Sequence, residues 1–235
     1  GARASWSVVF ATVARKRGRA GHRAFVVEKG TPGFRIGKIE EKMGLRASET
    51  AEQVFDDCRV PAENLLGGEE HYERRARDGF KLAMQTFDAT RPLVAAMAVG
   101  IGRAAYEYAR DYVRENYDLG RPVPRYRAIR EVLASMAGRL DAARLLAWKA
   151  AWMADEGIPN SREASMAKAY AGKVALEVCS DAIELLGDSG ATIDHPVETW
   201  FRDVKVFDIF EGTGQVQRVI ISRRIFEAMG AGAES

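Results

Sequence analysis

The stretch Phe207-Asp-Ile-Phe-Glu-Gly-Thr-Gly-Gln-Val-Gln-Arg218 joins a short apolar run to an amphipathic one. Two glycines let the backbone turn, and Thr213 is of a residue type that favours the N-cap of a helix. Apolar residues then recur at helical spacing: Val216, Val219 and Ile220. We therefore expect a helix to begin just after Glu211, which leaves that carboxylate beside the helix start. Taken alone, such a glutamate is more often a capping or solvated residue than a catalytic one.

The composition is that of a globular protein. The chain has 235 residues, of which 47% are hydrophobic and 29% charged, and this length suits one large domain or two modest ones. The formal net charge is +2, from 35 basic and 33 acidic residues. Such a balance gives no overall electrostatic signature for nucleic acid or for an anionic membrane.

Metal sites and membrane spans are not expected. The two cysteines, Cys58 and Cys179, lie far apart, and the chain has only three histidines, which argues against a structural zinc site. Separated free thiols are typical of a reducing compartment. No apolar run has the length of a transmembrane helix, and no signal peptide precedes the first apolar run. We therefore expect a cytoplasmic protein.

The sequence pattern at the start of the chain predicts strands and turns. Short β-prone runs occur at Val8–Val13, Ala24–Val27 and Val54–Phe55, separated by glycine-rich and charged breakers. A β-segment of this size has exposed edges that need a partner. We place a partial β-domain at residues 1–68.

The remainder, residues 69–235, has helical periodicity. Apolar residues recur at helical spacing over 94–112, 129–143 and 167–185, and a fourth helix is expected after Glu211. Loops are expected at 120–124 and 157–159, and Pro92 should begin or kink the first helix. The predicted fold is α+β: a partial β-domain followed by an antiparallel four-helix bundle.

Several segments, in this order along the chain, resemble signatures of the acyl-CoA dehydrogenase family. They are Glu41–Thr50, Val54–Gly67, Phe87–Pro92, Ala164–Lys168, His195–Glu198, Arg202-Asp203 and Phe210–Thr213. The resemblance implies a β-domain packed on a helical bundle, with FAD and an acyl-CoA bound between them. It also implies oxidation of the acyl-CoA and transfer of electrons to an electron-transfer flavoprotein.

The resemblance assigns the chemistry to Glu211. In the family, a glutamate at this position removes the α-proton of the thioester while a hydride passes from the β-carbon to the flavin. An α-proton beside a thioester is weakly acidic, so its base must be held within reach and the developing enolate must meet preorganised donors. The backbone N–H groups of the turn, including that of Gly212, can supply part of that donor set. Hydride transfer requires a redox cofactor, because no side chain can perform it.

Other site residues follow from the same resemblance. The family has a second position for its base, which here is Thr90, and a threonine cannot act as a base. Asp88 and Arg91 match residues near the thioester and the base, although such a pair could simply be an N-cap and a surface ion pair. Thr213 and Gln215 match contacts from the chain to its own flavin.

Several positions depart from the family. Where the family grips a neighbouring subunit's flavin with an arginine and a phenylalanine, this chain has Asn116 and Leu119. Where the family has glutamine and a glycine pair, this chain has Glu184 and Gly187-Asp188. Arg127 replaces another common glutamine. The two carboxylates would lie where a pyrophosphate is expected and would repel it. Two interpretations of a basic cluster stay open, an offset to this repulsion and a solvated helix start: Arg121, Arg125, Arg127 and Arg130.

The resemblance implies a dimer or tetramer, and these departures favour a hetero-oligomer over a homo-oligomer. They lead to one hypothesis: the chain is the catalytic half of a heteromeric acyl-CoA dehydrogenase. The family's N-terminal helical domain and first middle-domain strands are absent from the sequence, so we expect neither tight FAD binding nor turnover without them or a partner. Two alternatives stay open. One is a non-catalytic interaction subunit, and the other is a flavin oxidase or monooxygenase of the same fold.

Overall fold

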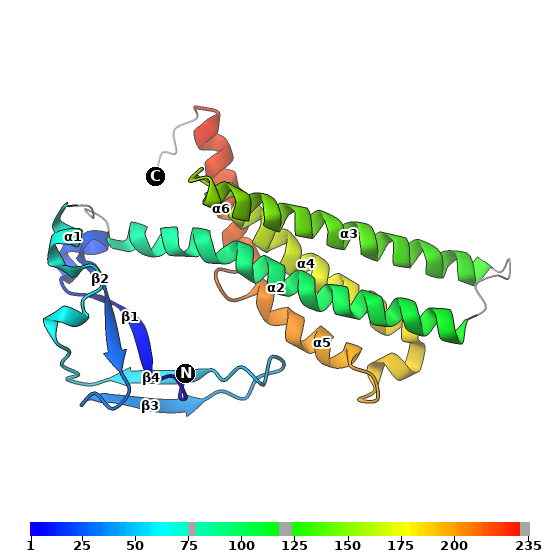
Figure 1. The fold of residues 1–235 in the computed structure, drawn as a ribbon, viewed down its shortest axis with the longest axis horizontal. Coiled ribbons are helices and arrows are strands. Elements are labelled where there is room, and N and C mark those ends of the chain that lie inside the picture. Colours follow the sequence, from blue (N-terminus) through cyan, green and yellow to red (C-terminus); the bar gives the residue numbers. More distant parts are fainter. Residues whose placement is uncertain (75–78, 118–123, 231–235) are drawn as a thin grey trace. The chain divides into compact units, whose positions relative to one another are not determined.

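The computed structural model describes residues 1–74, 79–117 and 124–230 (Figure 1). The chain divides into two compact units. The first comprises Gly1–Lys42 and Arg46–Thr86, and the second comprises Met43–Leu45 and Phe87–Ser235. The chain passes from the first unit to the second between residues 86 and 87, whereas the boundary predicted from the sequence lies between 68 and 69, at the start of α1.

The first unit contains two antiparallel hairpins. Strand β1 (Trp6–Thr12) pairs with β2 (His22–Glu28), and β3 (Phe34–Ile39) pairs with β4 (Ala51–Phe55). A 3-10 helix, η1 (Arg15–Gly21), connects the first pair. The expected strands overlap β1, β2 and β4. Strand β3 was not predicted, because Gly37 interrupts its apolar alternation and the register shifts between Ile36 and Ile39.

A short helix completes this unit. After the 3-10 turn η2 (Ala62–Asn64), α1 (Gly68–Arg74) packs beside β2. The Tyr72 hydroxyl accepts a hydrogen bond from the backbone N–H of Ala24 at 3.1 Å. The buried Arg23 guanidinium lies 4.4 Å from the centre of the Tyr72 ring and bonds Glu69 at 2.9 Å. A cation on an aromatic face, paired with a carboxylate, therefore fastens α1 to the strand.

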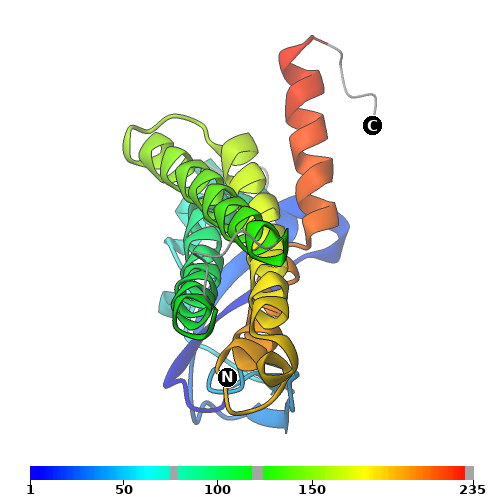
Figure 2. The same ribbon diagram turned by 90° about the vertical axis from the view of Figure 1, so that its right-hand side faces the viewer.

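The second unit is helical. Its elements are α2 (Gly79–Asn116, which begins in the first unit), α3 (Pro124–Asp155), α4 (Ser161–Leu186), η3 (Gly187–Ala191), α5 (Val197–Val204), η4 (Lys205–Asp208) and α6 (Gly214–Ala228). The long helices α2, α3 and α4 run side by side in two perpendicular views (Figures 1 and 2). Helix α4 is central because it contacts α3, α5 and α6. The α+β fold class is confirmed.

The helices differ from the prediction in two places. Pro92 lies inside α2, so the helix does not begin there. Helix α5 was not predicted because eight residues are too few to establish a period. The expected loop at 157–159 is present, with Gly157 in the left-handed region. The loop expected at 120–124 lies outside the described residues up to 123, and α3 begins at Pro124.

The core of the helical unit is built largely from small residues. Fully buried alanines recur on α2, α3 and α4, interleaved with larger residues such as Val113, Met136 and Val178. At Gly102 on α2, an added Cβ would lie 2.8 Å from a Leu140 methyl group and 3.3 Å from the Ala175 Cα. Small side chains therefore let three helices approach closely, and the bundle is fixed by shape as well as by apolar burial.

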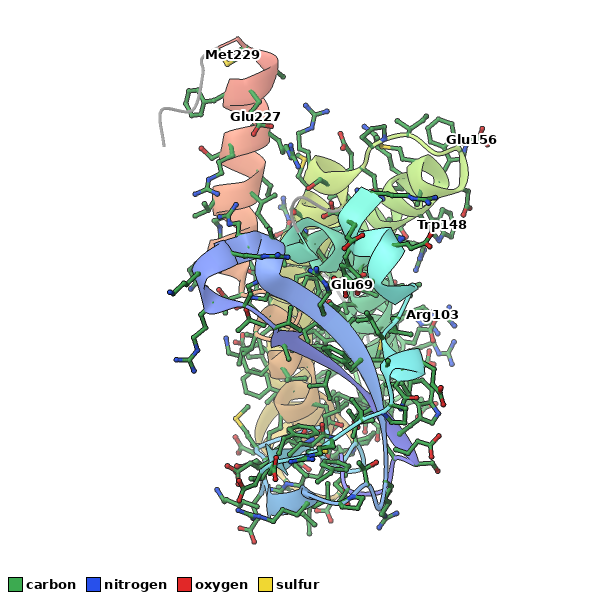
Figure 3. The ribbon with its side chains drawn as sticks, turned by 90° about the vertical axis from the view of Figure 1, so that its left-hand side faces the viewer. Glu69, Arg103, Trp148, Glu156, Glu227 and Met229 are labelled. Atoms are coloured by element: carbon green, nitrogen blue, oxygen red, sulfur yellow. The ribbon has the colours of Figure 1, made fainter. Side chains whose placement is uncertain are left out.

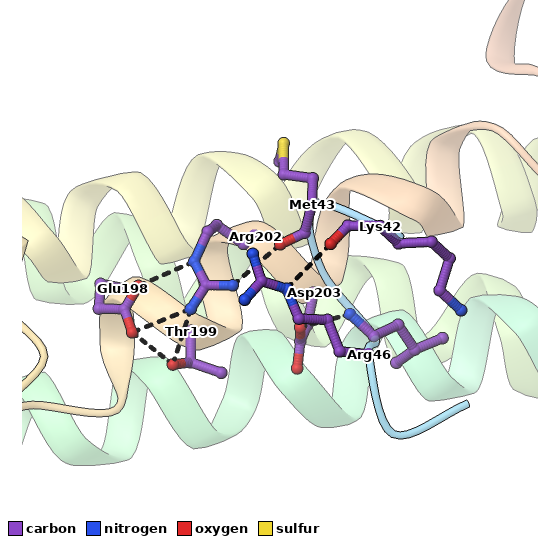
Figure 4. A network of polar contacts seen from close by, with 8 residues as sticks. Lys42, Met43, Arg46, Glu198, Thr199, Arg202 and Asp203 are labelled. Carbon is purple, nitrogen blue, oxygen red and sulfur yellow. Dashed lines mark hydrogen bonds and ion pairs between the residues drawn. The ribbon is translucent and has the colours of Figure 1, made fainter. Parts of the chain in front are cut away.

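Helix α5 holds a distant segment of the same unit (Figure 4). Arg202 bonds Glu198 one turn earlier and donates to the Met43 carbonyl at 2.9 Å, while Asp203 accepts from the Leu45 N–H. Between these contacts, a Cβ on Gly44 would lie 2.2 Å from the Arg202 carbonyl oxygen. Only glycine fits there, so residues 43–45 are held against α5.

Several large apolar side chains remain exposed. Trp148 on α3 and Met229 at the end of α6 project outward (Figure 3) and are 63% and 72% exposed. None of the helices in the described part of the chain is both long and apolar enough to cross a membrane.

Candidate functional site

The turn before α6 has an unusual backbone. Glu211 has φ of +59° and Gly212 has φ of +91°, so two consecutive residues are in the left-handed region. For a non-glycine residue this costs about 1–2 kcal/mol. Thr213 then returns to extended geometry and caps α6, with its Oγ1 accepting from the Val216 N–H at 3.4 Å. The predicted N-cap is confirmed, and Glu211 lies three residues before the helix.

Buried donors hold this turn from the side of α4 and α6. The Nζ of Lys168, on α4, donates to the Gly212 carbonyl at 2.6 Å. The Nε2 of Gln217, on α6, donates to the Glu211 carbonyl at 3.0 Å and the Gly212 carbonyl at 2.9 Å. Both side chains are fully buried. Two consecutive carbonyls are thus satisfied by side chains, which offsets the backbone cost of the left-handed turn.

The carboxylate of Glu211 is held from α2. Thr90 Oγ1 donates to Glu211 Oε2 at 2.8 Å, although the two residues are 121 positions apart. Within the described part of the chain, no ion pair joins Glu211 to a basic side chain at 4.0 Å or less. The half-buried carboxylate is therefore oriented by one hydrogen bond and keeps a second oxygen for another contact.

Asp88 and Arg91 form an ion pair inside α2. Arg91 Nη1 lies 2.6 Å from Asp88 Oδ1, and Arg91 is only 4% exposed. Burial lowers the pKa of Arg91, whereas the charges of Asp88 and Glu211 raise it. Because α2 begins at Gly79, Asp88 is not an N-cap, and the arginine is not a surface residue. The buried Arg91, paired with Asp88, is therefore close enough to Glu211 to interact with its charge.

Lys168 is a second buried cation near this carboxylate. Burial lowers the pKa of Lys168 to about 8; Asp208 and Glu211 oppose this shift and Arg91 adds to it. At neutral pH the ammonium form therefore prevails, and it is the stronger hydrogen-bond donor to Gly212.

The first turn of α6 offers donors for a polar ligand. Gln215 is exposed, and its side-chain amide bonds no described residue. Thr213 is half-buried beside it. The free N–H groups and positive dipole end of a helix N-terminus suit the polar edge of a cofactor. Among the described residues, no group of three or more metal-ligating side chains converges on one point.

The positions that depart from the resemblance are exposed. Glu184 lies in the last turn of α4 and Asp188 in the first turn of η3. Asn116 donates to the Tyr112 carbonyl at 2.8 Å. Arg127 pairs with Glu131 at 3.0 Å. Leu119 and Arg121 lie outside the described residues, as does the side chain of Arg125.

Sequence reasoning named Glu211, Thr213, Asp88 and Arg91 but missed two further parts of the site. Lys168 ends the segment Ala164–Lys168 that resembles the family, but the sequence alone assigns it no role. Gln217 follows Glu211 by six positions, at the end of the first turn of α6, and was not predicted to belong to the site. The motif around Lys168 was the available signal, because a lysine among alanines and serine on an apolar helix is rarely buried without a partner.

Comparisons with known proteins cover nearly the whole chain. Residues 1–58 match the family "Acyl-CoA dehydrogenase, middle domain" and residues 77–226 match "Acyl-CoA dehydrogenase, C-terminal domain". Cyclohexane-1-carbonyl-CoA dehydrogenase of Syntrophus aciditrophicus is 44% identical over 209 residues, which are 89% of this chain and 53% of that protein.

Solved structures of related proteins have a similar fold. Butyryl-CoA dehydrogenase from Megasphaera elsdenii has a TM-score of 0.88 at 40% identity. A chain of the electron transferring flavoprotein structure of Acidaminococcus fermentans has a TM-score of 0.88 at 45% identity. Each comparison covers 96% of this chain and 57% of the other. The chain thus spans little more than half the length of the proteins it matches.

Proposed function

Because the chain belongs to the acyl-CoA dehydrogenase family, we propose that it takes part in the FAD-dependent α,β-dehydrogenation of an acyl-CoA thioester, with Glu211 as the base for the α-proton. The observation that carries this proposal is the held carboxylate. Glu211 is fixed by Thr90 at one oxygen, forms no ion pair with a described basic residue, and sits on a turn secured by Lys168 and Gln217.

This arrangement suits proton abstraction. A base works best when its reach and orientation are set before the substrate arrives. In the reaction, Glu211 takes the α-proton onto a carboxylate oxygen. The backbone N–H of Glu211 donates to no described residue, so it is free to bond the thioester oxygen as negative charge develops there. Asp88 and Arg91, together with Gly212, complete the proposed substrate contacts.

The residues at the start of α6 fit the proposed flavin. Thr213 and Gln215 would hold it through the cap hydroxyl and the exposed amide, at the positive end of the helix. When bound, FAD supplies the acceptor for the hydride that leaves the β-carbon. The side chains of this chain supply binding, orientation and the base.

We propose an electron-transfer flavoprotein as the redox partner. The 45% identity to a chain of the Acidaminococcus fermentans structure supports this choice. The two free thiols, Cys58 and Cys179, agree with a cytoplasmic location.

We further propose that the enzyme is a hetero-oligomer in which this chain keeps the base but does not hold a neighbour's flavin. Glu184, in the last turn of α4, and Asp188, in the adjoining η3, are exposed, and the dipole of α4 is negative at this end. A pyrophosphate would meet three sources of negative potential there. The Asn116 amide, which already bonds its own helix backbone, offers no compensating cation.

The test of the base is Glu211→Gln in the complete protein. Exchange of the α-proton of a bound saturated acyl-CoA with D2O should fall by at least about 100-fold, because an amide cannot accept the proton. The exchange is followed by NMR or mass spectrometry of the recovered thioester. Retained exchange would remove Glu211 from the reaction.

Glu227→Gln is the matched control. Glu227 lies on α6, is exposed, and pairs with Arg224 at 2.8 Å away from the turn (Figure 3). It undergoes the same chemical change and should leave exchange unaltered. A loss in both variants would indicate a defect of the whole helical unit and not of the base.

A further inference from the structure

Lys168 is the largest fully buried side chain of the described residues, with an exposed fraction of 0%. A lysine is rarely so deep unless its ammonium has a specific partner. Here that partner is the carbonyl of Gly212, at 2.6 Å. The buried ammonium therefore bonds one backbone carbonyl, that of the residue next to Glu211.

The turn needs such a partner. Glu211 is one of three non-glycine residues with positive φ among the described ones, and its neighbour Gly212 is also left-handed. The carboxylate is attached to α2 through Thr90, while the backbone carbonyls are attached to α4 and α6 through Lys168 and Gln217. If the Lys168 bond is lost, the peptide after Glu211 can rotate toward a more ordinary conformation.

We propose, on the basis of Glu211 being the α-proton base, that Lys168 is a positioning residue whose buried ammonium holds the Gly212 carbonyl and so keeps the Glu211 carboxylate aimed at the substrate. Gln217 shares the task through neutral hydrogen bonds. What Lys168 adds is charge. Its ammonium is a charged and therefore stronger hydrogen-bond donor to the Gly212 carbonyl than the neutral amide of Gln217.

Three charged groups act on the Lys168 ammonium from the elements around it. Asp208 on η4 and Glu211 favour the charged form, while Arg91 on α2 disfavours it. Burial outweighs them and lowers the pKa of Lys168 to about 8. The ammonium is therefore lost within an accessible pH range, and the turn should respond to that loss.

The first measurement needs neither substrate nor flavin. The sequence contains two Gly-Thr pairs, Gly30-Thr31 and Gly212-Thr213. Labelling glycine carbonyls with 13C and threonine nitrogens with 15N selects these two peptide bonds in an NMR spectrum. The Gly212 signal should titrate with a midpoint near pH 8, and the Gly30 signal is the internal control. A Gly212 signal without a midpoint between about pH 7 and 9 would overturn the proposal.

The second measurement is the pH profile of the complete, flavin-loaded protein. Wild-type kcat should fall above about pH 8, as the ammonium deprotonates. Lys168→Met should lower kcat at pH 7 by about 10- to 100-fold, as expected for a misplaced base, with KM within about twofold, and should abolish the fall above pH 8. A folded Lys168→Met variant with wild-type kcat and the same alkaline fall would overturn the role.

Lys173→Met is the matched control on the same helix. Lys173 is exposed and pairs with Glu177 at 3.6 Å, so its loss should leave both profiles unchanged. The wild-type titrations need no variant and therefore decide the matter even if Lys168→Met does not fold. If Glu211→Gln retains activity, Glu211 is not the base and the positioning role of Lys168 is rejected with it. If Glu211→Gln loses activity but Lys168→Met behaves like the wild type, only the role of Lys168 is rejected.

Discussion

Replacing Lys168 by methionine should change how the stability of the helical unit depends on pH. Burial lowers the pKa of Lys168 from 10.5 to about 8. Below pH 8 the lysine is charged in both the folded and the unfolded chain. Between pH 8 and 10.5 the unfolded chain keeps a proton that the folded chain has released, so raising the pH stabilises the fold. Above 10.5 the lysine is neutral in both states, and the effect ends.

The size of the effect follows from the two pKa values. They differ by 2.5, that is 10.5 minus 8, and one pKa unit corresponds to about 1.4 kcal/mol. The wild-type protein should therefore gain up to roughly 3 kcal/mol of unfolding free energy between pH 7 and 10.5, relative to a variant without this lysine. The methionine chain is of similar length, so the apolar packing of α4 is largely kept.

Urea unfolding at several pH values measures this difference. Urea is preferred to guanidinium because it adds no salt, and helix content is followed by circular dichroism. Cys179 has the opposite effect on the pH dependence of stability. Burial raises the pKa of its thiol from 9.0 to about 12, so its contribution to the unfolding free energy falls as the pH rises above 9. Both proteins carry Cys179, so subtracting the two curves cancels its contribution.

A flat difference between the two curves from pH 7 to 10.5 would refute the reasoning, because it would mean that Lys168 keeps an ordinary pKa in the folded state. Lys173→Met supplies the reference for a solvent-exposed lysine of the same helix, and it should give a flat difference. Only the slope with pH is decisive. A constant offset reports the lost hydrogen bond to Gly212 and any change in packing.

Two further predictions concern the ion pair of α2 and the assembly. Asp88→Asn leaves Arg91 buried without its carboxylate, so the unfolding free energy measured in urea should fall by about 3 kcal/mol. The control is Glu107→Gln, which breaks an exposed ion pair on the same helix and should lower the unfolding free energy by less than about 1 kcal/mol. Equal losses in the two variants would contradict the burial argument. In the complete enzyme, native mass spectrometry should find fewer flavins than protomers, because Glu184 and Asp188 disfavour a neighbour's pyrophosphate; one flavin per protomer in a homo-oligomer would reject the hetero-oligomer.

Much of the fold was predictable because its apolar patterns extend over many residues. The three long helices carry apolar residues at helical spacing over many turns, and β1 and β2 are bounded by clear breakers. The prediction failed where the pattern is short or interrupted. Helix α5 has too few residues to show a period, and Gly37 breaks the alternation of β3. Pro92 was expected to begin or kink the first helix, and the sequence does not reveal that α2 continues on both sides of it.

The local structure of the site was predictable where it lies in one continuous segment: the turn around Glu211 and the N-cap at Thr213 follow from neighbouring residues. The roles given to Glu211, Asp88 and Arg91 rest on the family resemblance and stay predictions. The contacts made by Thr90 and Lys168 could not be predicted in this way. They join positions 121 and 44 residues apart. A lysine among small residues on an apolar helix indicates a buried partner, but the sequence does not identify that partner as the Gly212 carbonyl.

The contacts between α5 and residues 43–45 also bear on folding kinetics. The bond between Leu45 and Asp203 spans 158 positions along the chain, and closing a flexible loop of that length costs on the order of 4–5 kcal/mol of chain entropy. A few hydrogen bonds cannot offset this until α4 and α5 have already packed. Residues 43–45 should therefore dock late in folding and detach first in unfolding, with Gly44 setting the close approach that makes docking possible.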